Sequence, residues 1–326
     1  MHISAGTLDD LLRKVIENLR KQGHQTNPTK GPATEIFGAL LELTNPRARL
    51  SRTETKGTLF SCLGEFLWYL AKSNEVSFIE YYVPGYAKYS DDGTTIYGAY
   101  GPRLFGTTGN NQIVRIQSHL REGGDTRQAV VQLFDAQDII EDHNDVPCTC
   151  TLQFVRRQGQ LHMLTHMRSN DAFLGLPHDV FAFTMLQELV ARDIGAELGV
   201  YRHAVGSLHL YNADFERADK FLNEGWQSRT AMPPMPTETQ WSAVSTLLEA
   251  ETVLRHGGHI DVSALGLADY WSDIVRLLQV FSLSKLDENF REIKNRRIIA
   301  GIKKEMRSPV YDAYIRRRED RLQGMV

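Results

Sequence analysis

Four short motifs between residues 146 and 211 combine side chains that can do chemistry on a small anionic ligand. In chain order they are Pro147-Cys148, Arg168-Ser169, Leu174-Gly175-Leu176-Pro177 and His209-Leu210-Tyr211. A cysteine thiolate is a nucleophile, and an arginine beside a hydroxyl suits an oxyanion such as phosphate. The carboxyl group of Asp179 and the His-x-Tyr pair can form hydrogen bonds to a base and to a sugar hydroxyl. This order of residues indicates chemistry on a nucleotide.

Taken together, these motifs resemble the thymidylate synthase superfamily over roughly residues 8 to 225. Members attack C6 of a pyrimidine nucleotide with a cysteine and then join a one-carbon unit to C5. The resemblance implies an α/β fold of the α+β kind, in which helices pack on a mixed sheet. It places the catalytic core in residues 1–230 and leaves residues 231–326 as a helical C-terminal region packed on that core.

The composition bounds the class of protein without naming a function. With 326 residues, 42% apolar and 24% charged, and a net charge of -3, the chain can form a large core in one domain or two closely joined ones. The basic residues are scattered, apart from 316–318, so no nucleic-acid partner is expected. The sequence shows neither a membrane-spanning apolar run nor a signal peptide pattern. We therefore expect a soluble cytoplasmic protein.

Three cysteines are too few for a disulfide framework, and no second pair accompanies Cys148 and Cys150 to form a zinc site. No metal is expected. On a strand, Cys148 and Cys150 would point to the same face. Cys62 and Cys150 are interpreted as buried small apolar residues. Cys148 is interpreted as the nucleophile because of the motifs around it.

The resemblance gives Cys148 the covalent step. Its thiolate would add to C6 of the pyrimidine, which makes C5 nucleophilic, and the cation of Arg168 would lower the pKa of the thiol. Glu65, on a helix expected over 58–71, matches the family's water-ordering glutamate and would also move protons. The alternative is a glutamate on the helix surface. Tyr97, in a retained Tyr-Gly pair, is expected in the catalytic group.

The phosphate of the nucleotide is expected to meet several cations and hydroxyls. Arg168 and Ser169 would bind it within one chain, and Lys30 would add a point charge, unless it is an ordinary surface lysine. In the family a pair of arginines reaches across a dimer interface to the partner's phosphate. Only Arg127 of that pair is kept here, because the second position is Gln128. The resemblance thus implies a homodimer with shared active sites.

The remaining ligand contacts follow from the same resemblance. The sugar 3'-hydroxyl would be held by His209 and Tyr211, which face the same side of a strand. The donor would be 5,10-methylenetetrahydrofolate, whose pterin would bond to Asp171 beside Gly175. Tyr86 and Tyr89, in place of the usual tryptophans, would wall the folate ring, although a structural aromatic cluster would have the same sequence.

Asp179 decides the choice of base. It stands where thymidylate enzymes carry asparagine, as in the hydroxymethylases that act on cytosine nucleotides. Cytosine offers an amino donor at C4 and an acceptor at N3, which a carboxyl group can satisfy, and uracil offers the reverse. The alternative is that Asp179 only caps a helix over 180–190.

The expected function is therefore C5 hydroxymethylation of a pyrimidine nucleotide monophosphate, CMP or dCMP. One alternative is methylation of dUMP by the thymidylate synthase reaction. Another is a dimer that senses nucleotides without catalysis, with the helical C-terminal region as its output. No residue that reads the sugar 2' position is identified.

The elements that would position these residues are expected from periodicity and turn residues. Helices are predicted over 7–20 and 58–71 and around 113–120, strands over 35–38 and 129–133, and a loop over 23–32. The last hundred residues predict helices over 240–254, 265–278 and 287–307.

Overall fold

The computed structural model describes residues 1–106, 110–285 and 292–321. The chain divides into two compact units, Met1–Ala231 and Met232–Val326. Every predicted site residue lies in the first unit.

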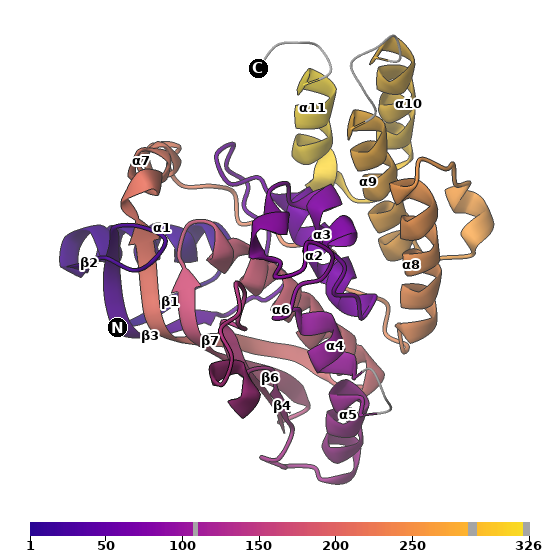
Figure 1. The fold of residues 1–326 in the computed structure, drawn as a ribbon. Helices are drawn as coiled ribbons and strands as arrows, with labels where there is room; N and C mark the ends of the chain where they lie inside the picture. The colour runs from indigo at the N-terminus through magenta and orange to yellow at the C-terminus, as the bar shows by residue number, and fades with distance from the viewer. Residues whose placement is uncertain (107–109, 286–291, 322–326) are drawn as a thin grey trace. The chain divides into compact units, whose positions relative to one another are not determined.

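A mixed sheet forms the centre of the first unit (Figure 1). Its strands run in the order β1-β3-β7-β6-β5-β4, with β2 paired to β3. Two neighbouring pairs, β1 with β3 and β6 with β7, are parallel, and the others are antiparallel. The strands are β1 His2–Ala5, β2 His24–Thr26, β3 Ala33–Leu43, β4 Val130–Gln132, β5 Thr149–Arg157, β6 Gln160–Asp171 and β7 Glu197–Tyr211. The predicted mixed sheet with packed helices is confirmed.

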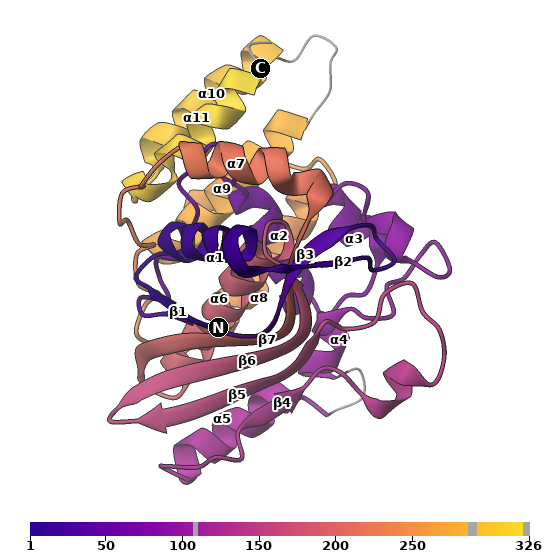
Figure 2. The ribbon, with the colours of Figure 1, turned by 90° about the vertical axis from the view of Figure 1, so that its left-hand side faces the viewer.

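Two helices with apolar faces cover one side of this sheet (Figure 2). α1 (Leu8–Gln22) begins where the Thr7 side chain accepts a hydrogen bond from the Asp10 backbone N–H, and its buried leucines pack on β1 and β3. α6 (Gly175–Asp193) is buried along most of its length against β6 and β7. The other helices of the unit are α2 Leu59–Leu70, α3 Val76–Tyr82, α4 Tyr100–Phe105, α5 Gln112–Glu122 and α7 Phe215–Asn223.

Three local predictions were wrong in detail. The segment predicted as a loop contains β2, because its backbone pairs with the first residues of β3. Cys148 precedes β5 while Cys150 lies within it, at a register shift between Thr149 and Thr151, so the two cysteines do not share a regular strand. Asp179 does not cap a helix, because α6 begins four residues earlier, at Gly175.

The second unit is helical among its described residues. Its helices are α8 Trp241–Arg255, α9 Asp269–Lys285, α10 Glu292–Glu305 and α11 Asp312–Arg321. The start of the helix predicted over 287–307 lies outside the described residues. Within this unit Trp271 is buried and donates a hydrogen bond from Nε1 to Gln240 Oε1 at 2.6 Å, which ties the start of α8 to α9.

Candidate active site

The segment that carries Cys148 is held by Arg168 on the neighbouring strand β6. The Arg168 backbone N–H donates to the Cys148 carbonyl at 2.8 Å. Its side chain donates from Nε to the Pro147 carbonyl and from Nη2 to the Val146 carbonyl, both at 2.9 Å. The predicted nucleophile and the predicted oxyanion ligand are thus neighbours, and the arginine also fixes the backbone in front of the thiol.

Burial is the largest influence on the pKa of the Cys148 thiol. It raises the pKa of Cys148 above its ordinary value, and the charge of Arg168 acts in the opposite direction without reversing the shift. The carboxyl groups of Asp179 and Asp145 raise the pKa further, and Lys30 lowers it. The expected role of Arg168 therefore holds in direction, but the thiol is less acidic in this structure than an isolated one.

Asp179 lies inside α6 with only 7% of its surface exposed. Its Oδ2 accepts a hydrogen bond from Asn170 Nδ2 at 2.7 Å. Burial, followed by the charge of Glu65, raises the pKa of Asp179 to about 8, although the bond from Asn170 lowers it. Gly175 packs closely beside this pair, since a Cβ there would lie 3.1 Å from Asn170 Nδ2 and 3.5 Å from Asp179 Oδ2.

A buried polar chain continues behind Asn170. Asn170 Oδ1 lies 3.2 Å from His203 Nε2, and His203 Nδ1 lies 2.7 Å from the Tyr201 hydroxyl. The sequence motifs did not indicate Asn170, Tyr201 or His203. Their signal is a pair of polar aromatic side chains, Tyr201 and His203, at alternate buried positions of β7 between the buried residues Gly199 and Val205.

Glu65 faces the same region from α2. It accepts a hydrogen bond at 2.5 Å from the hydroxyl of Tyr69, one helical turn further on. Its charge contributes to the raised pKa values of Asp179, Tyr69 and Tyr86. These couplings place the carboxyl group toward the interior of the site and not on an open helix surface.

The two tyrosines predicted to wall the folate ring, Tyr86 and Tyr89, belong to a cluster of aromatic side chains. Tyr86 packs edge-on against Trp68 at 5.7 Å and against Tyr89 at 5.2 Å between ring centroids. Tyr100, which the sequence analysis did not single out, accepts hydrogen bonds from the Thr149 backbone N–H at 3.1 Å and from its hydroxyl at 3.0 Å. Tyr100 therefore holds the residue that follows Cys148, the predicted nucleophile.

Tyr97 lies in a different polar cluster. Its ring stacks on His143 at 3.5 Å between centroids, and the Arg103 guanidinium lies 5.2 Å from the ring centre. Arg103 in turn donates two hydrogen bonds of 2.8 Å to Asp138. The described contacts of Tyr97 are with this cluster, so the structure does not group Tyr97 with Glu65.

The other predicted ligand residues lie around the ends of β6 and β7. Asp171 Oδ1 accepts the backbone N–H groups of Phe173 at 2.8 Å and Leu174 at 3.0 Å, which shapes the turn into α6. Ser169 pairs with Ser207, and Asp171 pairs with His209, across the parallel strands.

The rings of His209 and Tyr211 meet edge-on at 5.0 Å, as expected for alternate residues of one strand. Lys30 lies over the ring of Tyr89, with its nitrogen 4.5 Å from the centroid. Arg127 is exposed near the start of β4.

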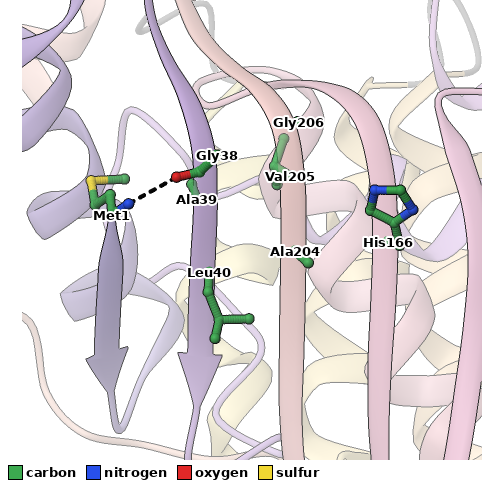
Figure 3. A pocket seen from close by; sticks show the side chains of 8 residues that line it. All are labelled: Met1, Gly38, Ala39, Leu40, His166, Ala204, Val205 and Gly206. Atoms are coloured by element: carbon green, nitrogen blue, oxygen red, sulfur yellow. Dashed lines mark hydrogen bonds between the residues drawn. The ribbon is translucent and has the colours of Figure 1, made fainter.

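A separate hollow of about 360 Å³ lies on the open face of the sheet. Figure 3 shows its lining from the N-terminus, β3, β6 and β7, with the Met1 amino group bonded to the Gly38 carbonyl at 2.8 Å. None of the predicted site residues lines it. The described residues contain neither a group of three side chains suited to a metal ion nor a helix long and apolar enough to cross a membrane.

The candidate site thus combines a buried carboxyl group, a cysteine whose segment is held by an arginine, and a glutamate beside aromatic rings, on a mixed α/β sheet. The thymidylate synthase family model matches residues 7–247. The chain belongs to the thymidylate synthase family. The match runs beyond the expected limit at residue 225, into α8.

Three phage proteins named deoxyuridylate hydroxymethyltransferase are similar to this chain. The protein of Pseudomonas phage M6 is 36% identical over 155 residues, covering 47% of this chain and 44% of its own length. That of Delftia phage PhiW-14 is 31% identical, covering 59% and 57%, and that of Bacillus phage SP01 is 30% identical, covering 63% and 57%. The chain thus spans about half the length of these relatives.

Proposed function

We propose that the protein hydroxymethylates C5 of a cytosine nucleotide monophosphate, CMP or dCMP. The observation that carries the choice of base is Asp179, a buried carboxyl group bonded to Asn170 and coupled to Glu65. The names of the phage relatives support hydroxymethyl transfer as the reaction type.

The protonation of Asp179 makes it a partner for cytosine. With its pKa raised to about 8, the group is neutral at pH 7 and has one O–H donor and one carbonyl acceptor. Cytosine accepts at N3 and donates from its C4 amino group, so both atoms of the carboxyl group can be paired. An unpaired buried polar group costs about 1–3 kcal/mol, which is enough to discriminate between bases.

The covalent step falls to Cys148. Its thiolate forms a bond to C6, the C5–C6 double bond gives up its electrons, and C5 becomes nucleophilic. Arg168 orients the segment of the nucleophile and has N–H groups left for phosphate. After C5 has gained its new carbon it must lose its proton, and we assign that proton to the carboxyl group of Glu65, which has Tyr69 beside it. Once water has added to the new carbon, the C6–S bond breaks, which restores the C5–C6 double bond and returns its electron pair to the Cys148 thiolate.

5,10-Methylenetetrahydrofolate would supply a carbon at the oxidation level of formaldehyde, which water converts to the hydroxymethyl group. The residues present fit such a donor. Asp171 uses Oδ1 for two backbone N–H groups, and among the described residues no hydrogen bond occupies Oδ2. That oxygen can accept from a pterin N–H next to Gly175, while Tyr86 and Tyr89 would cover the ring system.

The proposed assembly is a homodimer in which Arg127 binds the partner's nucleotide phosphate. Arg127 is exposed, and Phe37, in the middle of β3, is 84% exposed. In the proposed dimer this exposed ring would be covered by the partner. Lys30, Arg168 and Ser169 would bind phosphate from within the chain.

The test is mass spectrometry of CMP, dCMP, UMP and dUMP after incubation with the protein and the folate donor. We expect the mass of formaldehyde to be added to a cytosine nucleotide. The Asp179→Asn variant should shift preference toward uracil by tenfold or more, because an amide can turn to pair with uracil. An unchanged preference in a folded variant would contradict the role of Asp179.

Deoxyuridylate hydroxymethylation is the second candidate, and the names of the three relatives favour it. It predicts the same added mass on dUMP. Addition of a methylene alone to dUMP would indicate the thymidylate synthase reaction. No product, together with nucleotide binding that survives Cys148→Ser, would indicate the sensing dimer.

A further inference from the structure

The polar chain behind Asp179 is enclosed along its whole length. Tyr201 and His203 are 0% exposed, Asn170 is 4% exposed and Asp179 is 7% exposed. Its links are 2.7 Å from Tyr201 to His203, 3.2 Å from His203 to Asn170, and 2.7 Å from Asn170 to Asp179. Burying four polar side chains costs free energy unless each donor meets an acceptor. The position of each hydrogen along this chain is therefore constrained by the positions of the others.

The hydrogen bonds of this polar chain all donate in one direction, from Tyr201 toward Asp179. Burial lowers the pKa of His203 to about 3, so the ring is neutral at pH 7 and carries one N–H. Because Nε2 faces the Asn170 carbonyl oxygen, the hydrogen must lie on Nε2, and Nδ1 must accept from the Tyr201 hydroxyl. Asn170 then presents its NH2 group, and not its carbonyl, to Asp179.

This direction determines which oxygen of Asp179 can hold a proton. Oδ2 receives the N–H of Asn170 and is kept as an acceptor, so the proton of the neutral acid lies on Oδ1. Oδ1 of Asp179 is thereby the hydrogen-bond donor, and Oδ2 is the acceptor. Cytosine and uracil present opposite orders at N3 and C4, so a fixed order matches one of them. If Asn170 turned over, the order would be lost.

We propose that Tyr201 and His203 are positioning residues that fix the orientation of Asn170 and thereby set the choice of Asp179 between cytosine and uracil. This inference rests on the proposed role of Asp179 as the reader of the base. It does not depend on which base is preferred. Charged and titratable groups that also act on Asp179 or respond to it are Glu65, His178, Asp171, Cys148, Tyr69 and Tyr100.

Tyr201→Phe tests the proposal, because it removes the first donor of the chain and keeps the ring. We would measure kcat/KM with CMP, dCMP, UMP and dUMP from pH 5 to pH 9 in the full-length protein with the folate donor. The ratio between cytosine and uracil nucleotides should fall about tenfold toward unity. The alkaline decline for cytosine nucleotides should move to higher pH, since the bond from Asn170 lowers the pKa of Asp179.

Thr184→Val is the matched control. Thr184 is also fully buried, and its hydroxyl bonds to the Val180 carbonyl within α6, so the variant loses a buried hydroxyl without touching the chain behind Asp179. Its ratio should stay within twofold of the unaltered protein. A folded Tyr201→Phe variant with an unchanged ratio and an unchanged pH profile would overturn the proposal.

The two proposals fail in different ways. If the unaltered protein prefers uracil, the assignment of cytosine fails, while relaxation in Tyr201→Phe still supports the positioning role. If no nucleotide is turned over, the same ratio is taken from dissociation constants measured by calorimetry, and it must still fall in Tyr201→Phe and hold in Thr184→Val.

Discussion

At the scale of single residues, the site keeps two acids from ionising. Burial raises the pKa of both the Cys148 thiol and the Asp179 carboxyl group, and the charge of Asp179 raises the pKa of the thiol further. A nucleophile must lose its proton and a reader of cytosine must keep one. The site therefore opposes a state in which both groups are charged, which suits a reaction that needs only the thiolate.

The pH dependence of alkylation tests this arrangement at Cys148. In a background with Cys62→Ser and Cys150→Ser, the rate of modification by iodoacetamide should rise with pH through an apparent pKa above that of an exposed cysteine, because burial disfavours the thiolate. Replacing the cation in Arg168→Gln should move the midpoint still higher. Half-maximal modification below pH 8 in the unaltered Arg168 background would contradict the direction of the shift.

The residues that sequence reasoning found are those whose neighbours along the chain form a motif. Cys148 and Arg168 were identified from dipeptides, and the structure brings them together because they flank one strand pairing. Tyr201 and His203 were missed because their partner, Asn170, belongs to another strand. The placement of Tyr97 by Arg103 and His143 likewise depends on tertiary contacts that a Tyr-Gly pair does not encode.

At the scale of elements, the start of α6 places the backbone of Gly175 beside the pair of side chains proposed to select the base, Asn170 and Asp179. Gly175→Ala would place a methyl group 3.1 Å from Asn170 Nδ2, so the Asn170–Asp179 pair must shift. We expect kcat/KM to fall more than tenfold with little loss of folding. Steady-state kinetics and thermal denaturation check this prediction.

Gly301→Ala, in the exposed part of α10, is the control for that substitution. Its added Cβ meets nothing within 4 Å, so alanine there should leave activity unchanged and raise stability by about 0.5–1 kcal/mol. Equal activity of the Gly175→Ala variant and the unaltered protein would show that the pair tolerates the shift.

Periodicity predicted the starts of α1 and α2 to within one residue, but it placed the start of α6 five residues too late and that of α9 four residues too early. It failed for short elements. β2 has three residues and little apolar character, so its pairing with β3 is determined by the neighbouring strand and not by its own sequence.

At the scale of the whole molecule, shared sites predict complementation. Cys148→Ser lacks the nucleophile and Arg127→Ala lacks the cation proposed for the partner, so each homodimer should lose most of its activity. A mixture that exchanges subunits should form heterodimers with one intact site, and about a quarter of full activity should return in an equal mixture by random pairing. The measurement is turnover before and after mixing.

Two controls complete that experiment. Sedimentation equilibrium should show a dimer, and Phe37→Asp should shift it toward monomer by placing a charge on the exposed centre of β3. Mixing two Cys148→Ser preparations should restore nothing. Activity that stays absent in verified heterodimers would show that Arg127 serves its own chain or no site.

The hydrogen bonds that hold the Arg168 side chain to the segment before Cys148 also affect the affinity of this arginine for an anion. Two N–H groups of its guanidinium are engaged by the Pro147 and Val146 carbonyls. A free arginine loses rotamer freedom worth about 2 kcal/mol when it is immobilised. Here much of that ordering is completed during folding, so the phosphate proposed to bind Arg168 would meet a side chain that is already ordered, and affinity would be gained without any additional contact.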